Sequence, residues 1–110
     1  MMNKARAKLF LLLTLCLLGS AQADLAVRDD TGQHLRLKQA PQRIVSLAPH
    51  ATELLFAAGA GQRIVGAAEY SDYPEAARRI PRVGGALLDL EAIAALRPDL
   101  IVAWADGNPP

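Results

Sequence analysis

The polar residues that could support catalysis lie close together near the middle of the chain. His50 and Glu53 are three residues apart, a spacing that would place both on one face of a helix, where they could share a metal ion. A lone His-x-x-Glu pair falls short of the three protein ligands of a typical catalytic zinc. Ser46 could act as a nucleophile with His50 and an aspartate, but no Gly-x-Ser-x-Gly turn surrounds it. A small hydrolase or metal enzyme using His50, Glu53 and Asp72 is therefore the least favoured function.

Both tyrosines of the chain, Tyr70 and Tyr73, and its only tryptophan, Trp104, lie at or next to the ends of apolar segments. Aromatic rings in a cleft offer a large flat apolar surface with a polar tip, which suits a large and partly apolar ligand. The competing interpretation is that Trp104 belongs to the core and that Tyr73 packs against Pro74. These residues favour ligand binding over bond cleavage.

Three short apolar segments are expected to position these residues as parallel β-strands. They cover Ile44–Leu47, Ile64–Ala67 and Leu100–Trp104, and apolar runs without alternation are typical of strands that are buried on both faces. Helical segments between them predict an open α/β layer, in which ligands bind beyond the carboxyl ends of the strands. The loops expected at that edge are Ala48–His50, Ala68–Pro74 and Ala105–Pro110.

The helix between the first two strands is predicted over Pro49–Gly59. Proline suits the first helical position, and glycine suits the position just after the helix. Its expected buried stripe consists of Leu54, Leu55 and Ala58. A shorter helical piece is expected over Glu75–Arg79.

Another helix is predicted to begin after Asp89, whose side chain is a plausible N-cap. The residues expected to face inward from it are Leu90, Ile93, Ala94 and Leu96.

The first residues have the three parts of an export signal. Basic residues precede the apolar block Leu9–Leu18, and the small residues Ala21 and Ala23 suit a signal peptidase, so we expect cleavage after Ala23 and a periplasmic protein. A membrane anchor is the competing interpretation, but the apolar block is much shorter than the roughly 20 residues that span a bilayer. Cys16 is followed by further leucines, which disfavours lipidation.

Composition limits the rest of the chain. Its 110 residues carry a formal charge of +1 and one cysteine, which disfavours nucleic-acid binding and excludes an internal disulfide. The segment 24–41 is expected to form an N-terminal β-hairpin extension, with a turn at Asp29–Gly32. Residues 42–110 are expected to form the α/β layer.

The segment Arg43–Gly59 resembles the opening of the substrate-binding proteins that feed ABC importers for cobalamin, iron siderophores and haem. The segment Tyr70–Pro74, the pair Leu90 and Glu91, and Arg97–Trp104 followed by Gly107 and Asn108 are similar to its cobalamin-binding members. The resemblance covers Arg43 to Asn108. It implies a non-catalytic binding protein with two α/β lobes joined by a long helix, and a ligand held between the lobes.

The resemblance also implies roles for individual residues. Tyr70 matches a tyrosine that contacts the corrin ring, Trp104 a tryptophan near the cleft, and Glu91 a glutamate that docks on arginines of the membrane permease. The expected ligand-binding residues are Tyr70, Trp104, Pro49, His50 and Asp72. A monomer without a cofactor is expected, with cobalamin or a related corrinoid as the transported ligand. A siderophore or haem is the alternative ligand.

The chain departs from the cobalamin binders in two places. Gly84 and Gly85 stand where these proteins often carry another tryptophan, and the segment Asp24–Lys38 is more like the hairpin of siderophore binders. The chain also stops where the family continues, so residues 42–110 are expected to be an incomplete N-terminal lobe.

Overall fold

The computed structural model describes residues 24–108. Within this part, the chain forms two compact units, one ending at Ala40 and the other beginning at Pro41. The predicted export signal, residues 1–23, lies outside the described residues. No helix among residues 24–108 is long and apolar enough to cross a membrane.

The first unit is a β-hairpin, as predicted. Strand β1 (Leu25–Arg28) pairs antiparallel with β2 (His34–Leu37). In the turn, the Asp29 carboxylate accepts hydrogen bonds from the Thr31 hydroxyl and from the backbone N–H groups of Thr31 and Gln33. These bonds, that of the Thr31 hydroxyl first, hold the pKa of the Asp29 carboxyl below its ordinary value. Gly32 supplies the positive φ that the turn needs, at +85°.

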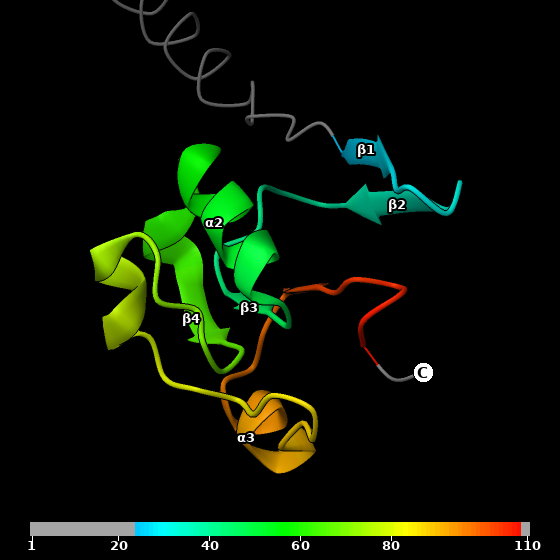
Figure 1. Ribbon diagram of the computed structural model, residues 1–110. Coiled ribbons are helices and arrows are strands. Elements are labelled where there is room, and N and C mark those ends of the chain that lie inside the picture. Colours follow the sequence, from blue (N-terminus) through cyan, green and yellow to red (C-terminus); the bar gives the residue numbers. More distant parts are fainter. Residues whose placement is uncertain (1–23, 109–110) are drawn as a thin grey trace, which may run out of the picture. The chain divides into compact units, whose positions relative to one another are not determined.

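The second unit is built on a parallel sheet, which confirms the predicted α/β class. The strand order is β4 (Ile64–Ala67), β3 (Ile44–Ser46), β5 (Leu100–Val102), and Figure 1 shows β3 beside β4. All three residues of β3 are buried. The chain around Pro81–Val83 adds to the free side of β4, where Ala67 donates to the Pro81 carbonyl and accepts from the Val83 N–H.

Strand β5 is less buried than its sequence predicts. Ile101 is 48% exposed, and Leu100 and Val102 are only half-buried. The reason is position, because β5 lies at the edge of the three-stranded sheet while β3 has a neighbour on each side. The strand also ends at Val102, so Trp104 belongs to the loop that follows.

Helix α2 (Pro49–Ala57) follows β3 and packs against it. Its predicted ends are confirmed, with proline in the first turn and Gly59 just beyond the end at a φ of +85°. The predicted buried stripe is wrong: Leu54 is 66% exposed and Ala58 is exposed. The buried residues of α2 are Ala51 and Thr52, because that side of the helix faces β3.

Helix α3 (Leu90–Ala95) begins as predicted, with the Asp89 carboxylate accepting from the Ala92 N–H at 2.9 Å. Only Ile93 of the four residues expected to face inward is buried; Leu96 is half-buried, and Leu90 and Ala94 are exposed. One short helix against one small core buries a narrower stripe than a helix covered on two sides. Two 3₁₀ helices, η1 (Gly61–Arg63) and η2 (Glu75–Arg79), complete the unit.

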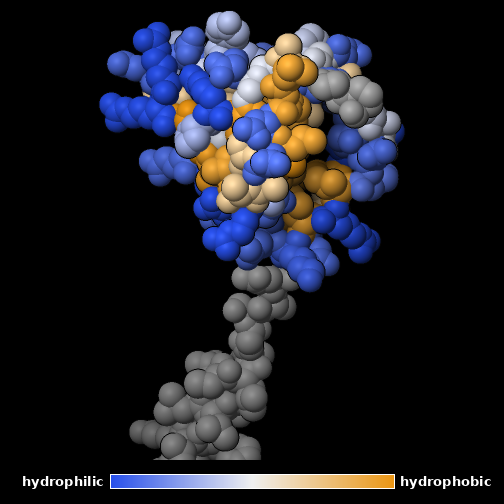
Figure 2. All heavy atoms as spheres, turned by 90° about the horizontal axis from the view of Figure 1, so that it is seen from below, coloured by the Kyte–Doolittle hydropathy of each residue, from blue (hydrophilic) through white to orange (hydrophobic). Residues whose placement is uncertain are grey.

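The core lies between α3 and the sheet. Val45, Val83 and Ile93 form its buried centre, and the half-buried residues Leu47, Val65, Leu88 and Leu96 surround it. Gly66 makes this packing possible, because a Cβ there would meet the Leu96 side chain at 2.7 Å and Val83 at 2.9 Å. Viewed from below, hydrophobic residues also gather on the surface, with hydrophilic side chains around them (Figure 2). Leu87 and Leu90 are strongly exposed, at 88% and 71%.

Candidate functional site

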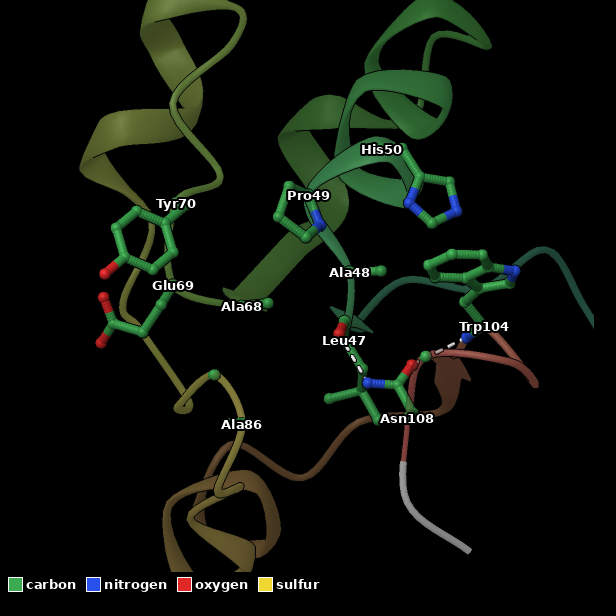
Figure 3. A pocket seen from close by; sticks show the side chains of 12 residues that line it. Leu47, Ala48, Pro49, His50, Ala68, Glu69, Tyr70, Ala86, Trp104 and Asn108 are labelled. Atoms are coloured by element: carbon green, nitrogen blue, oxygen red, sulfur yellow. Dashed lines mark hydrogen bonds between the residues drawn. The ribbon is translucent and has the colours of Figure 1, made fainter.

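The carboxyl ends of the three parallel strands open into a pocket of about 270 Å³ (Figure 3). Its walls come from the junction of β3 with α2, from the loop after β4 and from the loop after β5, with Gly85 and Ala86 at a fourth side. Of the predicted ligand-binding residues, the structure brings together Pro49, His50, Tyr70 and Trp104. Parallel strands end at one edge of their sheet, so residues far apart in sequence meet there.

His50 and Trp104 form one side of the pocket. Their ring centroids lie 4.8 Å apart with planes at 85°, an edge-to-face contact (Figure 3). Trp104 is 49% exposed, so it is a wall of the pocket and not part of the core. Its indole therefore keeps free apolar surface for a ligand.

Asn108 fastens the loop that carries Trp104. Its amide nitrogen donates to the Leu47 carbonyl at 2.9 Å, and its amide oxygen accepts from the backbone N–H of Trp104 at 2.8 Å (Figure 3). Gly107 lies against the indole, and a Cβ at this position would meet the ring at 2.4 Å. The loop after β5 is thus tied to the end of β3, with the indole seated over a residue that has no side chain.

Tyr70 and Glu69 form the opposite side (Figure 3). Tyr70 is 82% exposed and has a φ of +65°, a conformation that is costly for a bulky residue and that concentrates at functional sites. A Cβ at Gly85 would come within 3.3 Å of the Glu69 side chain. The absence of a side chain at Gly85 therefore leaves room for Glu69.

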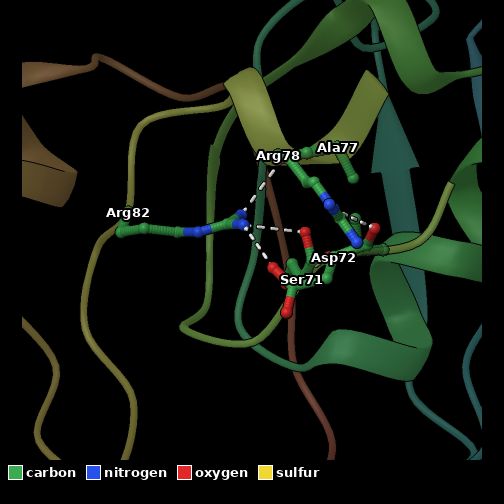
Figure 4. Close-up of polar contacts among 6 residues, drawn as sticks. Ser71, Asp72, Ala77, Arg78 and Arg82 are labelled. Atoms are coloured by element: carbon green, nitrogen blue, oxygen red, sulfur yellow. Dashed lines mark hydrogen bonds and ion pairs between the residues drawn. The ribbon is translucent and has the colours of Figure 1, made fainter. Parts of the chain in front are cut away.

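Asp72 does not line the pocket, and its predicted contact with a ligand stays a prediction. Its carboxylate pairs with Arg82 at 3.2 Å, and the same guanidinium donates to the carbonyls of Ser71 and Ala77 (Figure 4). Arg78 donates to the Asp72 carbonyl. The Asp72 carboxylate pairs with Arg82 and the Asp72 backbone carbonyl accepts from Arg78, so Asp72 helps to hold the loop that carries Tyr70.

Glu91 also lies outside the pocket, exposed in the first turn of α3. Its predicted contact with a permease stays a prediction.

The residues considered for catalysis are not assembled into a reactive centre. Ser46 is fully buried and its hydroxyl donates to the Ala48 carbonyl, whereas His50 is exposed and contacts Trp104. Within residues 24–108, His50, Glu53 and Asp72 do not come together as a metal-binding group.

Eight pocket residues were not among the predicted ligand-binding residues. Five of them lie in the loops predicted at this edge (Ala48, Ala68, Glu69, Gly107 and Asn108), whereas Leu47, Gly85 and Ala86 lie outside those loops. Asn108 stood in the quoted resemblance, and its place at the end of the loop after a strand was a usable signal. Glu69 directly precedes Tyr70 and carried the same signal, since it follows a strand end.

The fold and the pocket define a ligand-binding α/β lobe with its site at the carboxyl edge of a parallel sheet. The chain belongs to the periplasmic binding protein family, whose model matches residues 44–108. This family consists of binding proteins without catalytic activity.

The chain is similar to named members of that family. It is 51% identical over 75 residues to the vitamin B12-binding protein of Vibrio vulnificus, covering 66% of this chain and 28% of that protein. It is 53% identical over 70 residues to the vitamin B12-binding protein of Vibrio cholerae, covering 63% and 25%. The chain thus spans about a quarter of the length of these relatives.

Solved structures agree with this picture. The crystal structure of the periplasmic vitamin B12-binding protein of Vibrio cholerae matches with a TM-score of 0.62 and 52% identity, over 64% of this chain and 28% of that one. A periplasmic haem-binding protein of Pseudomonas aeruginosa matches with a TM-score of 0.60 and 35% identity, over 64% and 26%.

Proposed function

We propose that this chain supplies one wall of a cobalamin-binding cleft in a periplasmic receptor that delivers its ligand to an ABC importer. The observation that carries the proposal is the identity of about half the residues to vitamin B12-binding proteins across the segment that builds the pocket. The haem-binding neighbour has a similar fold but lower identity.

The pocket suits part of a large, partly apolar ligand. Trp104 and Tyr70 present aromatic surface from opposite sides, and Pro49 lies between them (Figure 3). Pockets that enclose a drug-sized ligand have about 300–1,000 Å³, and a corrinoid is larger than such a ligand. A pocket of about 270 Å³ therefore contacts one face of it.

The test is titration of cobalamin into the protein expressed from its whole gene, followed by calorimetry. We expect saturable heat, and we expect Tyr70→Ala to weaken binding by about tenfold through the loss of ring contact. Leu54→Ala, at an exposed apolar residue outside the pocket, is the control and should bind as the parent protein does. Binding of haem or a ferric siderophore in preference to cobalamin would support the alternative ligand and reject cobalamin.

We infer that the mature protein begins at Asp24, after removal of residues 1–23 by a signal peptidase. Support comes from the basic, apolar and small-residue segments in that order. Mass spectrometry of the periplasmic fraction would detect a chain that starts at Asp24. An intact N-terminus in that fraction would contradict the assignment.

We propose that the receptor is a monomer and that Glu91 docks it on the importer by contacting arginines of the permease. Its exposure at the start of α3, outside the pocket, leaves it accessible while a ligand is held. A surface carboxylate facing arginine directs orientation and association rate more than affinity.

A further inference from the structure

Three buried hydroxyl groups connect the elements on either side of the pocket. They belong to Ser46 at the end of β3, Thr52 in α2 and Ser71 in the loop after β4, and each residue is at most 1% exposed. The Thr52 hydroxyl donates to Ser46 Oγ at 2.9 Å, and Thr52 Oγ1 lies 3.1 Å from Ser71 Oγ. These side chains bind one another and not a ligand, because none of them lines the pocket.

Each of the three hydroxyls donates one hydrogen bond, and the following arrangement gives every one of these donors an acceptor. Ser71 donates to Thr52, Thr52 to Ser46, and Ser46 to the Ala48 carbonyl at 3.2 Å. This series of hydrogen bonds begins at Ser71, beside Tyr70, and ends at the Ala48 carbonyl, beside Pro49 and His50. A buried network that is fully satisfied is rigid, and a missing member leaves a buried donor unpaired.

Tyr70 needs such an anchor because its backbone is strained. Its φ of +65° persists only where neighbouring residues hold it. On one side, the Glu69 N–H donates to the Gly84 carbonyl at 2.8 Å. On the other side, Ser71 is held twice, by its hydroxyl to Thr52 and by its carbonyl to Arg82 at 2.9 Å (Figure 4).

We propose that Ser71 and Thr52 are positioning residues, whose buried hydroxyl chain to Ser46 holds Tyr70 in the orientation that meets the ligand. The inference rests on the proposed cobalamin function and adds specific residues that act without touching the ligand. It predicts that loss of a buried hydroxyl reduces ligand affinity through Tyr70.

The first experiment compares Thr52→Val with Thr52→Ser by cobalamin calorimetry on the whole gene product. Valine keeps the shape and removes the hydroxyl, so affinity should fall by about tenfold, the equivalent of one lost hydrogen bond. Serine keeps the hydroxyl and should bind within about threefold of the parent protein. Equal affinity of the two variants would overturn the proposal.

The second experiment is a double-mutant cycle with Ser71→Ala and Tyr70→Ala. If Ser71 acts through Tyr70, the double variant should bind no more weakly than Tyr70→Ala alone. If the two losses multiply, Ser71 does not act through Tyr70 and the proposal fails. Ser71→Ala also serves as the test if Thr52→Val does not fold.

A stability control separates positioning from general weakening of the fold. Ile93→Val removes one methylene from the core, far from the hydroxyl chain in sequence, and lowers the unfolding temperature. It should leave cobalamin affinity unchanged, and a tenfold loss here would overturn the proposal. Failure of the parent protein to bind cobalamin would reject the proposed function instead, which distinguishes the two.

Discussion

Two aromatic residues face each other across the pocket and are held by different means. Tyr70 depends on a strained backbone between two anchored neighbours. Trp104 depends on the side chain of Asn108 and on the missing side chain of Gly107. The residues that hold each ring are its neighbours in sequence: Glu69 and Ser71 for Tyr70, and Gly107 and Asn108 for Trp104.

Asn108→Ala should therefore weaken ligand binding without touching an aromatic ring. The substitution removes the hydrogen bonds to the Leu47 carbonyl and to the backbone N–H of Trp104, each with a net contribution of about 1 kcal/mol. We expect about a tenfold loss of cobalamin affinity by calorimetry. Gln62→Ala, which removes an exposed amide outside the pocket, is the matched control. Unchanged affinity in Asn108→Ala would show that the loop holds Trp104 without Asn108.

Glu91→Arg should separate binding from transport. Reversal of this exposed charge leaves the pocket intact but repels arginines on a permease, so uptake should fall by about tenfold or more while cobalamin affinity stays unchanged. The measurement is uptake of labelled cobalamin by cells that carry only the variant. Glu75→Arg, in the first turn of η2, is the control for a reversed surface charge. Equal uptake by both variants would exclude Glu91 from docking.

At the scale of elements, the start of β5 is locked to the start of β3. The Asp99 carboxylate accepts from the backbone N–H groups of Gln42 and Arg43 at 2.9 and 2.8 Å, and the Arg43 guanidinium donates to the Leu96 carbonyl at the end of α3. The bonds from Gln42 and then Arg43 lower the pKa of the Asp99 carboxyl below its ordinary value of 3.8. The lock thus holds strand β5, and with it the Trp104 loop, in register.

The hydrogen bonds accepted by the Asp99 carboxylate predict how the stability of the protein depends on pH. Because the pKa of Asp99 is lowered in the folded state, its carboxylate stabilises the fold above the unfolded-state pKa. This stabilisation is lost as the pH falls through the folded-state pKa. Asp99→Asn should lower the midpoint of urea unfolding at neutral pH. The difference from the parent protein should shrink as pH falls from about 5 toward about 3. Asp106→Asn, outside the lock, is the control. A difference that does not change with pH would show that the Asp99 charge is not involved.

At the scale of the whole molecule, the pocket of residues 24–108 offers a ligand contact from one side. Three of its walls come from the carboxyl ends of the strands, Gly85 and Ala86 form a fourth side, and about 270 Å³ is small beside a corrinoid. Enclosure on several sides buries most of a ligand's surface, whereas a single wall leaves much of it in water.

A protein that ends at Pro110 should accordingly bind cobalamin far more weakly than the vitamin B12-binding protein of Vibrio cholerae. Trp104 is the only tryptophan of the 110 residues and lies in the pocket, so its fluorescence should report binding directly. Titration of both proteins with cobalamin, side by side, gives the comparison. Equal affinities would show that this one wall is sufficient for capture.

The sequence by itself determined the local features: the parallel α/β pattern, the hairpin, the ends of α2 and the cap of α3. Apolar runs, Pro49, Gly59 and Asp89 act on the backbone within a few residues, so their effects can be predicted without the rest of the chain.

Only the tertiary structure decided which side chains meet. Asn108 bonds to Leu47 across 61 positions, and Asp99 bonds to Arg43 across 56. Asp72 pairs with Arg82 and does not line the pocket, and Leu54 is exposed because the opposite side of α2 faces β3. Such outcomes depend on which surfaces the folded chain brings together, and residue type and spacing do not contain that information.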